Sequence, residues 1–232
     1  MDLTVAQSTT PLSPTDRTQI RRVRERAATD REALYDVLTA GLICHLGVVI
    51  DGAPRVLPTA FAFDPDGPDR DGTLYLHGSV AAASLVAGRQ QTLCVTVTVV
   101  DGLVLARSAF HHSMNYRSAV VIGDPRPVTS PEERDHALTL IVDRLLPGRA
   151  ATLRDHTRKE LAATTVLGLP LHEASVKIRA EGVGDEPSDI EAGSWAGVVP
   201  VRTVFEPPET DPDTPPGTPT PPHVDAAVRG RR

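Results

Sequence analysis

Short β-type runs that follow one another through tight turns constrain this chain more than any other feature. The segments LICHLGVVI (42–50) and APRVLPTAFAF (53–63) meet at Asp51-Gly52, a dipeptide that tolerates positive φ and suits a two-residue hairpin. The run QTLCVTVTVV (91–100) alternates apolar residues with a cysteine and threonines, so one face of this strand is apolar and the other carries the threonines. Strands joined by tight hairpins pair antiparallel, which favours an antiparallel sheet or barrel.

Three more segments have strand character, and they bring the expected number of strands to six. They are GTLYLHG (72–78), AFHHSMNYRSAVVIGDPRPV (109–128) and LPLHEASVKIRAEG (169–182). We therefore expect a mainly β protein with peripheral helices, built on a six-stranded antiparallel barrel.

Three helices are expected outside the strands. Residues 29–40 carry apolar side chains at three- and four-residue spacing. Ser79 is expected to cap a short helix that ends at Gly88, because serine is a good N-cap and glycine a good terminator. The third helix starts at Ser130, where Glu133 is placed to complete a capping box.

The composition fits one folded domain with two extensions. The chain has 232 residues, of which 40% are hydrophobic, enough for one ordinary core. Residues 1–16 and 206–232 are polar and rich in proline, so we expect both ends to be disordered. The folded domain is expected over residues 17–205.

Several classes of function are excluded by charge and hydropathy. The formal net charge of −6 argues against nucleic acid as a partner, because phosphate neutralisation needs a concentrated positive field. No window approaches the roughly 20 apolar residues of a membrane span, and the N-terminus does not look like a secretory signal. Cys44 and Cys94 lie in separate apolar runs, as free buried thiols do in a reducing compartment. We expect a cytoplasmic protein.

No metal site is expected. His111 and His112 are neighbours, and neighbouring strand residues point to opposite faces, so the two cannot ligate one ion from a regular strand. Haem ligation by His77, His111 or His112 is disfavoured for the same lack of a recognisable ligand spacing.

Polar groups gather at the ends of the apolar strands. Hydroxyls, an amide and cations from separate segments form the set of donors that a phosphate group needs. The candidates are the hydroxyls of Thr59, Ser79, Ser84, Ser113 and Ser118, the amide of Asn115, and the cations Arg55, Arg89, Arg117, Lys177 and Arg179.

The order of these segments resembles a known family. RVLPTAF, LYLHGS, the long block around SAFHHSMNYRSAVVIG, VKIR and WAGVVP are similar, in sequence order, to the flavin-nucleotide-binding proteins related to pyridoxamine 5′-phosphate oxidase, in the branch that includes nitroimidazole-resistance proteins. The resemblance runs from about Arg21 to Val201. It implies an FMN-binding split β-barrel that forms a homodimer and holds FMN between the subunits.

The resemblance also implies which residues contact the cofactor. Leu57, Pro58 and Thr59 would follow the isoalloxazine edge, and His77, Gly78 and Ser79 would approach the ring and the phosphate end. The remaining cofactor-binding candidates are Ser84, Asn115, Tyr116, Arg117, Ser118, Lys177 and Trp195. His77 is the one candidate for a catalytic role, because the resistance-type relatives carry a functional histidine there.

The function implied is that of an FMN-dependent oxidoreductase that acts on a small molecule by hydride or electron transfer, with NAD(P)H as an electron source. Two alternatives stay open, namely a flavin-binding or storage protein without turnover, and a relative that uses deazaflavin (F420) or haem on the same barrel. The chain lacks the paired basic clamp of true pyridoxamine phosphate oxidases, so the resemblance does not imply that reaction.

Overall fold

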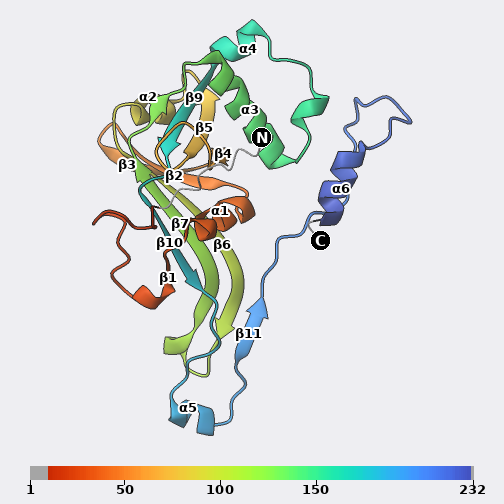
Figure 1. Cartoon of the computed structure of the whole chain (residues 1–232). Coiled ribbons are helices and arrows are strands. Elements are labelled where there is room, and N and C mark those ends of the chain that lie inside the picture. Colours follow the sequence, from red (N-terminus) through yellow and green to blue (C-terminus); the bar gives the residue numbers. More distant parts are fainter. Residues whose placement is uncertain (1–9, 231–232) are drawn as a thin grey trace, which may run out of the picture.

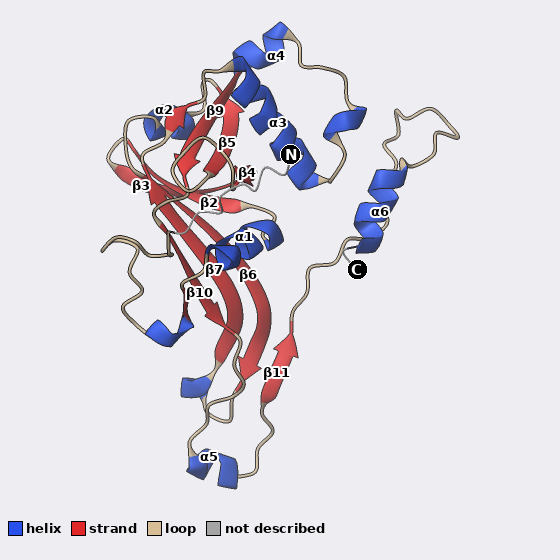
Figure 2. Ribbon diagram, viewed as in Figure 1, coloured by secondary structure: helices blue, strands red, loops and turns tan. Residues whose placement is uncertain are grey.

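Two antiparallel sheets with helices at their borders form the molecule in the computed structural model, which describes residues 10–230 (Figures 1 and 2). The expectation of a mainly β, antiparallel protein with peripheral helices is confirmed, and the arrangement is that of a split barrel. Within the described residues the strands number eleven rather than six, because two expected segments are each divided into two strands and three further strands, β1, β9 and β11, were not among the six.

The larger sheet, sheet A, has the strand order β1-β10-β7-β6-β2-β3, with β11 paired to the far half of β6. Its strands are β1 (Ala27–Ala28), β2 (Cys44–Ile50), β3 (Ala53–Thr59), β6 (Leu93–Leu105), β7 (Ser113–Gly123), β10 (Ala174–Arg179) and β11 (Gly197–Pro200). The expected hairpin is confirmed: Ile50 pairs with Ala53, and Asp51 and Gly52 have φ of 51° and 75°.

The smaller sheet, sheet B, has the order β4-β5-β9-β8. Its strands are β4 (Phe61–Asp64), β5 (Thr73–Ser79), β8 (Arg126–Pro127) and β9 (Thr164–Pro170). The helices are α1 (Arg31–Ala40), α2 (Ala83–Gly88), α3 (Pro131–Leu145), α4 (Arg158–Ala163), α5 (Pro187–Glu191) and α6 (Pro222–Gly230), with short 3-10 turns η1 (Arg24–Arg26), η2 (Ala109–His111) and η3 (Ala150–Thr152).

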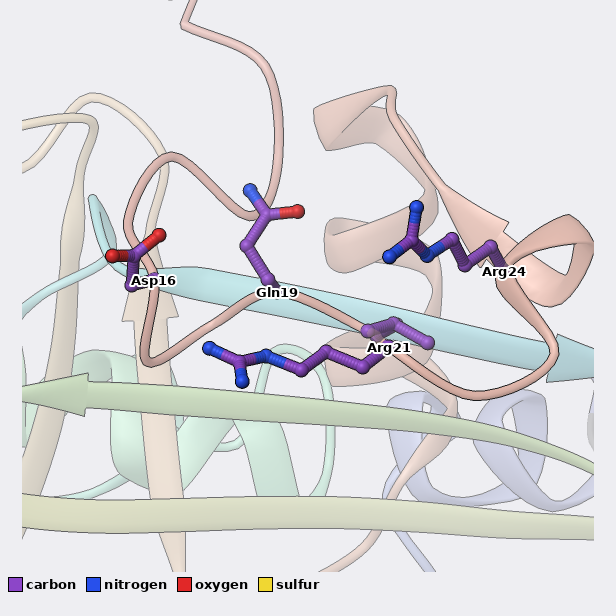
Figure 3. A pocket seen from close by; sticks show the side chains of 5 residues that line it. Asp16, Gln19, Arg21 and Arg24 are labelled. Carbon is purple, nitrogen blue, oxygen red and sulfur yellow. The ribbon is translucent and has the colours of Figure 1, made fainter.

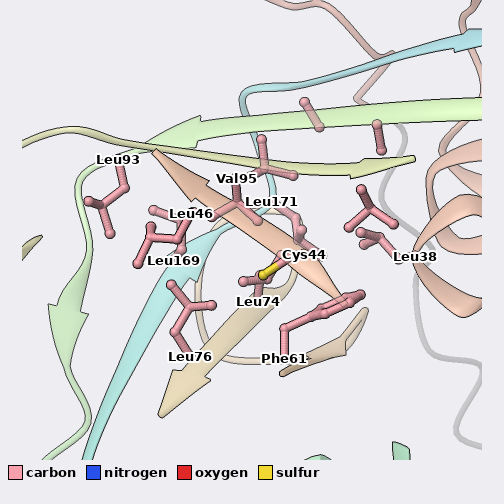
Figure 4. Close-up of a cluster of buried hydrophobic side chains, with 14 of the residues drawn as sticks. Leu38, Cys44, Leu46, Phe61, Leu74, Leu76, Leu93, Val95, Leu169 and Leu171 are labelled. Carbon is pink, nitrogen blue, oxygen red and sulfur yellow. The ribbon is translucent and has the colours of Figure 1, made fainter. Parts of the chain in front are cut away.

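The main core lies where sheet A, sheet B and α1 meet (Figure 4). Leu34 and Leu38 of α1, Leu74 of β5 and Leu93 of β6 are fully buried in it. Cys44 lies in the same cluster, and burial raises the pKa of its thiol to about 12. A second cluster packs α3 against the other side of sheet B, around Tyr75.

One expected helix cap and one expected capping box differ from the structure. Ser79 does not cap α2; the helix begins after Ala82, and the Ser79 hydroxyl accepts a hydrogen bond from the backbone N–H of Ala81. Ser130 does cap α3 by accepting from the N–H of Glu133. The Glu133 carboxylate, however, is held by Arg126 and Tyr75 rather than closing a capping box. A partly buried, charge-assisted pair outcompetes an exposed local bond for this carboxylate.

The ends of the chain carry local structure. Leu12 is buried in the main core and donates its N–H to the carbonyl of Thr29, so packing reaches below the expected boundary at residue 17. Within the expected tail, α6 buries Val228. Residues 1–9 of the expected N-terminal extension and residues 231–232 lie outside the described part, and the domain limits remain a prediction. Over residues 10–230, no helix is both long and apolar enough for a bilayer.

Candidate functional site

One face of sheet A turns away from the main core and carries polar groups. Leu46, Val95 and Ala119 point into the core with at most 2% exposure, so the side chains between them, on the same strands, point the other way. We call this surface the outer face. It holds Pro58, His45, Thr96, Thr98, Tyr116, Ser118 and Lys177.

Strand register brings four of the expected cofactor-binding residues onto the outer face. Thr98 pairs with Ser118, and Ser118 pairs with Lys177 on the next strand. The hydroxyls of Thr98 and Ser118 are 3.1 Å apart and share a hydrogen bond. Lys177 donates from Nζ to the carbonyl of Arg22, over 3.0 Å. Thr98, Ser118 and Lys177 therefore form a row of polar groups across three adjacent strands. Pro58 and Tyr116 lie on the same face at other register positions.

Two other candidates on β7 are already engaged within the chain. Arg117 forms a bidentate pair with Asp101, with N–O distances of 2.9 and 2.8 Å, and this hydrogen-bonded carboxylate raises the pKa of the guanidinium. Asn115 donates to the carbonyl of Glu181 and accepts from the Glu181 N–H. The Asn115 contacts hold the segment after β10 against β7, and the Arg117–Asp101 pair joins β7 to β6. Their first role is therefore structural.

The expected LPT segment ends β3, the edge strand of sheet A. Leu57 and Thr59 pair with Leu46 and Cys44, while Pro58 pairs with His45. Only Pro58 therefore belongs to the outer face, because the alternation of the strand turns its neighbours the other way.

The HGS segment lies at the end of β5, in sheet B. His77 has a buried Nδ1 atom without a hydrogen-bond partner in the described structure, and burial lowers the pKa of this imidazole. A side chain at Gly78 would place its Cβ 2.8 Å from Leu85 of α2, so glycine permits the close contact between strand and helix. Ser84 is half-buried in α2.

Trp195 lies far from HGS in the fold, just before β11. Its side chain is 71% exposed. The sequence-based placement of this indole over the cofactor remains a prediction.

A cationic cavity beside β10 was missed by sequence reasoning. It has a volume of ≈ 330 Å³ and is lined by Asp16, Gln19, Ile20, Arg21 and Arg24 (Figure 3). It lies next to the outer face, because Lys177 bonds to the backbone of Arg22 and β1 pairs with β10 at Lys177. Among the residues that the structure describes, no ion pair holds the guanidinium of Arg21 or Arg24. No sequence motif marks it, since it depends on how the N-terminal segment crosses β10.

Comparison with protein families identifies the chain. The model of the family described as pyridoxamine 5′-phosphate oxidase matches residues 30–178, well over half of the sequence. The chain belongs to this family. The match covers sheet B with the HGS segment, and sheet A except for β1, β11 and the last residue of β10.

Solved structures place this family member near two cofactor-binding proteins. The flavocytochrome Anf3 from Azotobacter vinelandii is 36% identical, with 94% of this chain and 99% of that chain covered and a TM-score of 0.85. The FAD and haem binding protein from Mycobacterium smegmatis is 38% identical, with 88% and 97% covered and a TM-score of 0.80.

A more distant structure shares the fold. The candidate 5-nitroimidazole antibiotic resistance protein from Bacteroides thetaiotaomicron is 21% identical, with 66% and 86% covered and a TM-score of 0.53. The comparison with curated protein sequences finds no match. Across residues 10–230, no three or more His, Cys, Asp or Glu side chains are grouped to hold a metal ion.

Proposed function

We propose that the chain is a redox protein of oxidoreductase type that binds a flavin and a haem. The observation that carries this proposal is the 38% identity, over 88% of the chain, to a protein that binds FAD and haem. The flavocytochrome Anf3, 36% identical over 94% of the chain, supports the same pair of cofactors.

The outer face fits the flavin. Planar rings can lie against small and hydroxyl-bearing side chains, and Thr98, Ser118 and Lys177 offer donors at adjacent register positions. His77 offers a second contact for the flavin, because its buried Nδ1 has no described protein partner. An unpaired buried polar atom costs free energy until a ligand or water forms a hydrogen bond with it. When bound, the flavin supplies hydride or electron transfer.

FAD is proposed in place of the FMN expected from the sequence. FAD carries a second phosphate and an adenosine, and therefore needs more positive charge and more surface than FMN. The cavity beside β10 offers both, through Arg21 and Arg24. FMN is the alternative, and the mass of the cofactor released from the purified protein distinguishes the two.

A second copy of the chain is proposed to complete the flavin site. β3 is an edge strand with Val56 67% exposed. Pro54 and Pro58 interrupt its hydrogen-bonding edge, which disfavours extension of the sheet by another strand. A partner would therefore cover the faces of β3 rather than its edge. Light scattering after size exclusion is expected to give a mass near twice 24.8 kDa.

Turnover is tested by reduction and reoxidation. We propose that NAD(P)H delivers electrons to the flavin and that a small molecule accepts them. Bleaching of the flavin band near 450 nm by NADH or NADPH, followed by recovery with an acceptor, supports this activity. A flavin that neither donor reduces would support a binding protein without turnover.

A further inference from the structure

The far half of the β6–β7 hairpin exposes a flat apolar surface. Leu103 pairs with Met114 on one side and with Val199 of β11 on the other. The three side chains therefore form a row across three strands on one face, and they are 43%, 48% and 43% exposed. On the opposite face Val104 is fully buried, whereas its register partners Ser113 and Val198 are exposed.

The indole of Trp195 extends this row. A Cβ atom at Gly197 would lie 2.9 Å from the Trp195 ring, so the ring covers Gly197 on the side where a side chain would project. Gly197 pairs with Leu105, two residues from Leu103 on the same face. We call the combined surface the apolar platform; it consists of Leu103, Leu105, Met114, Trp195 and Val199. An exposed patch of this kind on a protein surface marks a binding site.

His112 stands at the border of the platform in a fixed tautomer. Its Nδ1 is 2.8 Å from the carbonyl oxygen of Ser108. A carbonyl only accepts hydrogen bonds, so Nδ1 is the donor of this contact and Nε2 is the ring nitrogen that remains for a ligand. The side chain is exposed and its backbone is extended, two residues before Met114. A histidine that donates one ring N–H to a backbone carbonyl has the geometry of a metal ligand.

Other histidines are less suited to this role. His136 directs Nε2 at Asp64, 2.7 Å away. His172 contacts Asp71, which also pairs with the guanidinium of Arg31, and this polar surrounding is unlike a haem pocket. His111, the neighbour of His112, has Nε2 3.9 Å from Glu186.

We propose that Nε2 of His112 is an axial ligand of the haem iron and that the porphyrin packs against the apolar platform. This inference rests on the proposed function, because it assumes that the chain binds haem. A porphyrin is a broad, flat and mostly apolar ring, so it needs an apolar surface of matching shape and an imidazole nitrogen for its iron. The β6–β7 hairpin supplies the imidazole, and the hairpin and β11 together supply the apolar surface. The hairpin residues lie within 15 positions of one another in the sequence. The sequence analysis disfavours haem ligation by His112, because the sequence shows neither the contact with Ser108 nor the pairing of β11.

The test uses the full-length protein reconstituted with haemin. Titration followed at the Soret band gives the affinity, and electron paramagnetic resonance of the ferric protein reports the axial ligands. In His112→Ala we expect loss of the histidine-ligated spectrum and a rise in the haemin Kd on the order of tenfold or more. Added imidazole is expected to restore the spectrum. His156→Ala, at an exposed loop position, is the matched control, and His111→Ala tests the neighbouring imidazole.

The possible outcomes distinguish failure of the proposed function from failure of this inference. A wild-type protein that takes up flavin but no haemin overturns the haem part of the proposed function and this inference with it. A wild-type protein that takes up haemin, with an unchanged ligand spectrum in His112→Ala, overturns only the inference. Loss of the ligand in His111→Ala rather than in His112→Ala also overturns it. Circular dichroism of each variant, together with recovery by imidazole, separates loss of the ligand from loss of the fold.

Discussion

The Nδ1 atom of His112 lies 2.8 Å from the carbonyl oxygen of Ser108, at the tip of the hairpin formed by the two longest strands. This contact leaves Nε2 as the ring nitrogen that is available to a ligand, on an exposed side chain two residues before Met114. Together with the polar outer face at the other half of the same strands, it gives the sheet two different surfaces. The outer face fits a flavin, and the apolar platform fits a porphyrin.

Lys177 is expected to contribute to flavin affinity. The chain has only two lysines, and the other, Lys159, lies exposed on α4, which makes it a matched control. Lys177→Ala is expected to weaken flavin binding by about 1–3 kcal/mol, the scale of a hydrogen bond to a charged group. Quenching of flavin fluorescence on titration measures this. Equal affinities in Lys177→Ala, Lys159→Ala and wild type would count against the placement of the flavin on the outer face.

Arg126 is expected to stabilise the packing of α3 on sheet B. Its guanidinium binds Asp69 with N–O distances of 2.7 and 2.9 Å and also binds Glu133. Glu133 in turn accepts from Tyr75, and burial, followed by the nearby Glu133, raises the pKa of that phenol to about 12.

Arg126→Met would leave two mostly buried carboxylates without their cation. We expect a loss of about 1–3 kcal/mol in the free energy of unfolding, since the guanidinium is partly exposed and solvent screens the pair. Urea denaturation measures it. Arg158→Met, at an exposed position of α4, is expected to change stability by under about 0.5 kcal/mol. A loss in Arg158→Met as large as that in Arg126→Met would contradict this role.

Gly41 is expected to tolerate no side chain. A Cβ at this position would lie 2.1 Å from Cγ1 of Val97, a stiff β-branched side chain in the core. Its φ of −76° is ordinary, so the cost arises from overpacking alone. Gly41→Ala is expected to cost about 1–3 kcal/mol in the free energy of unfolding, whereas Gly182→Ala, with open space around it, is expected to be nearly neutral.

A double variant checks the cause. Val97→Ala removes the clashing methyl groups, so the penalty of Gly41→Ala is expected to shrink in that background. An unchanged penalty would show that the contact is not responsible.

Glu173 is expected to give the fold a specific acid sensitivity. Hydrogen bonds from Arg17 hold the pKa of this carboxyl at about 2, below its ordinary value of 4.5. Since the folded-state pKa is depressed, the pair stabilises the fold fully above pH 4.5, and this contribution is lost as the pH falls from 4.5 towards 2.

The comparison of wild type with Glu173→Gln isolates that contribution. Arg17 is half exposed, so solvent screening limits the difference in unfolding free energy to about 1 kcal/mol at pH 6. The difference is expected to vanish towards pH 2. A difference that is constant over this range would exclude the linkage.

Elements that are determined by a few neighbouring residues, such as turns and helix caps, could be predicted from the sequence. The Asp51-Gly52 turn and the start of α3 at Ser130 follow from positive φ and side-chain capping within four residues, and both are confirmed. β9 was missed because TTVLGLP directly follows α4 and is buried on both faces, which removes the alternation that identifies a strand.

The candidate site likewise contains features with a local signal in the sequence and features that depend on long-range pairing. Alternation within residues 91–100 predicts that Thr98 lies on the face opposite the valines, and the register then places Ser118 beside it. The apolar platform depends on the pairing of Leu103 with Val199, almost a hundred residues later, and the cavity at Arg21 depends on how the N-terminal segment crosses β10. Neither long-range pairing has a local signal in the sequence.

The absorption spectrum of the full-length protein, after reconstitution with FAD and haemin and removal of unbound cofactor, tests the central claim most directly. The account predicts a flavin band near 450 nm and a Soret band near 410 nm in the same protein peak, each at a stoichiometry close to one per chain. A protein that retains neither band would contradict it, and one that retains only the flavin band would contradict the haem site.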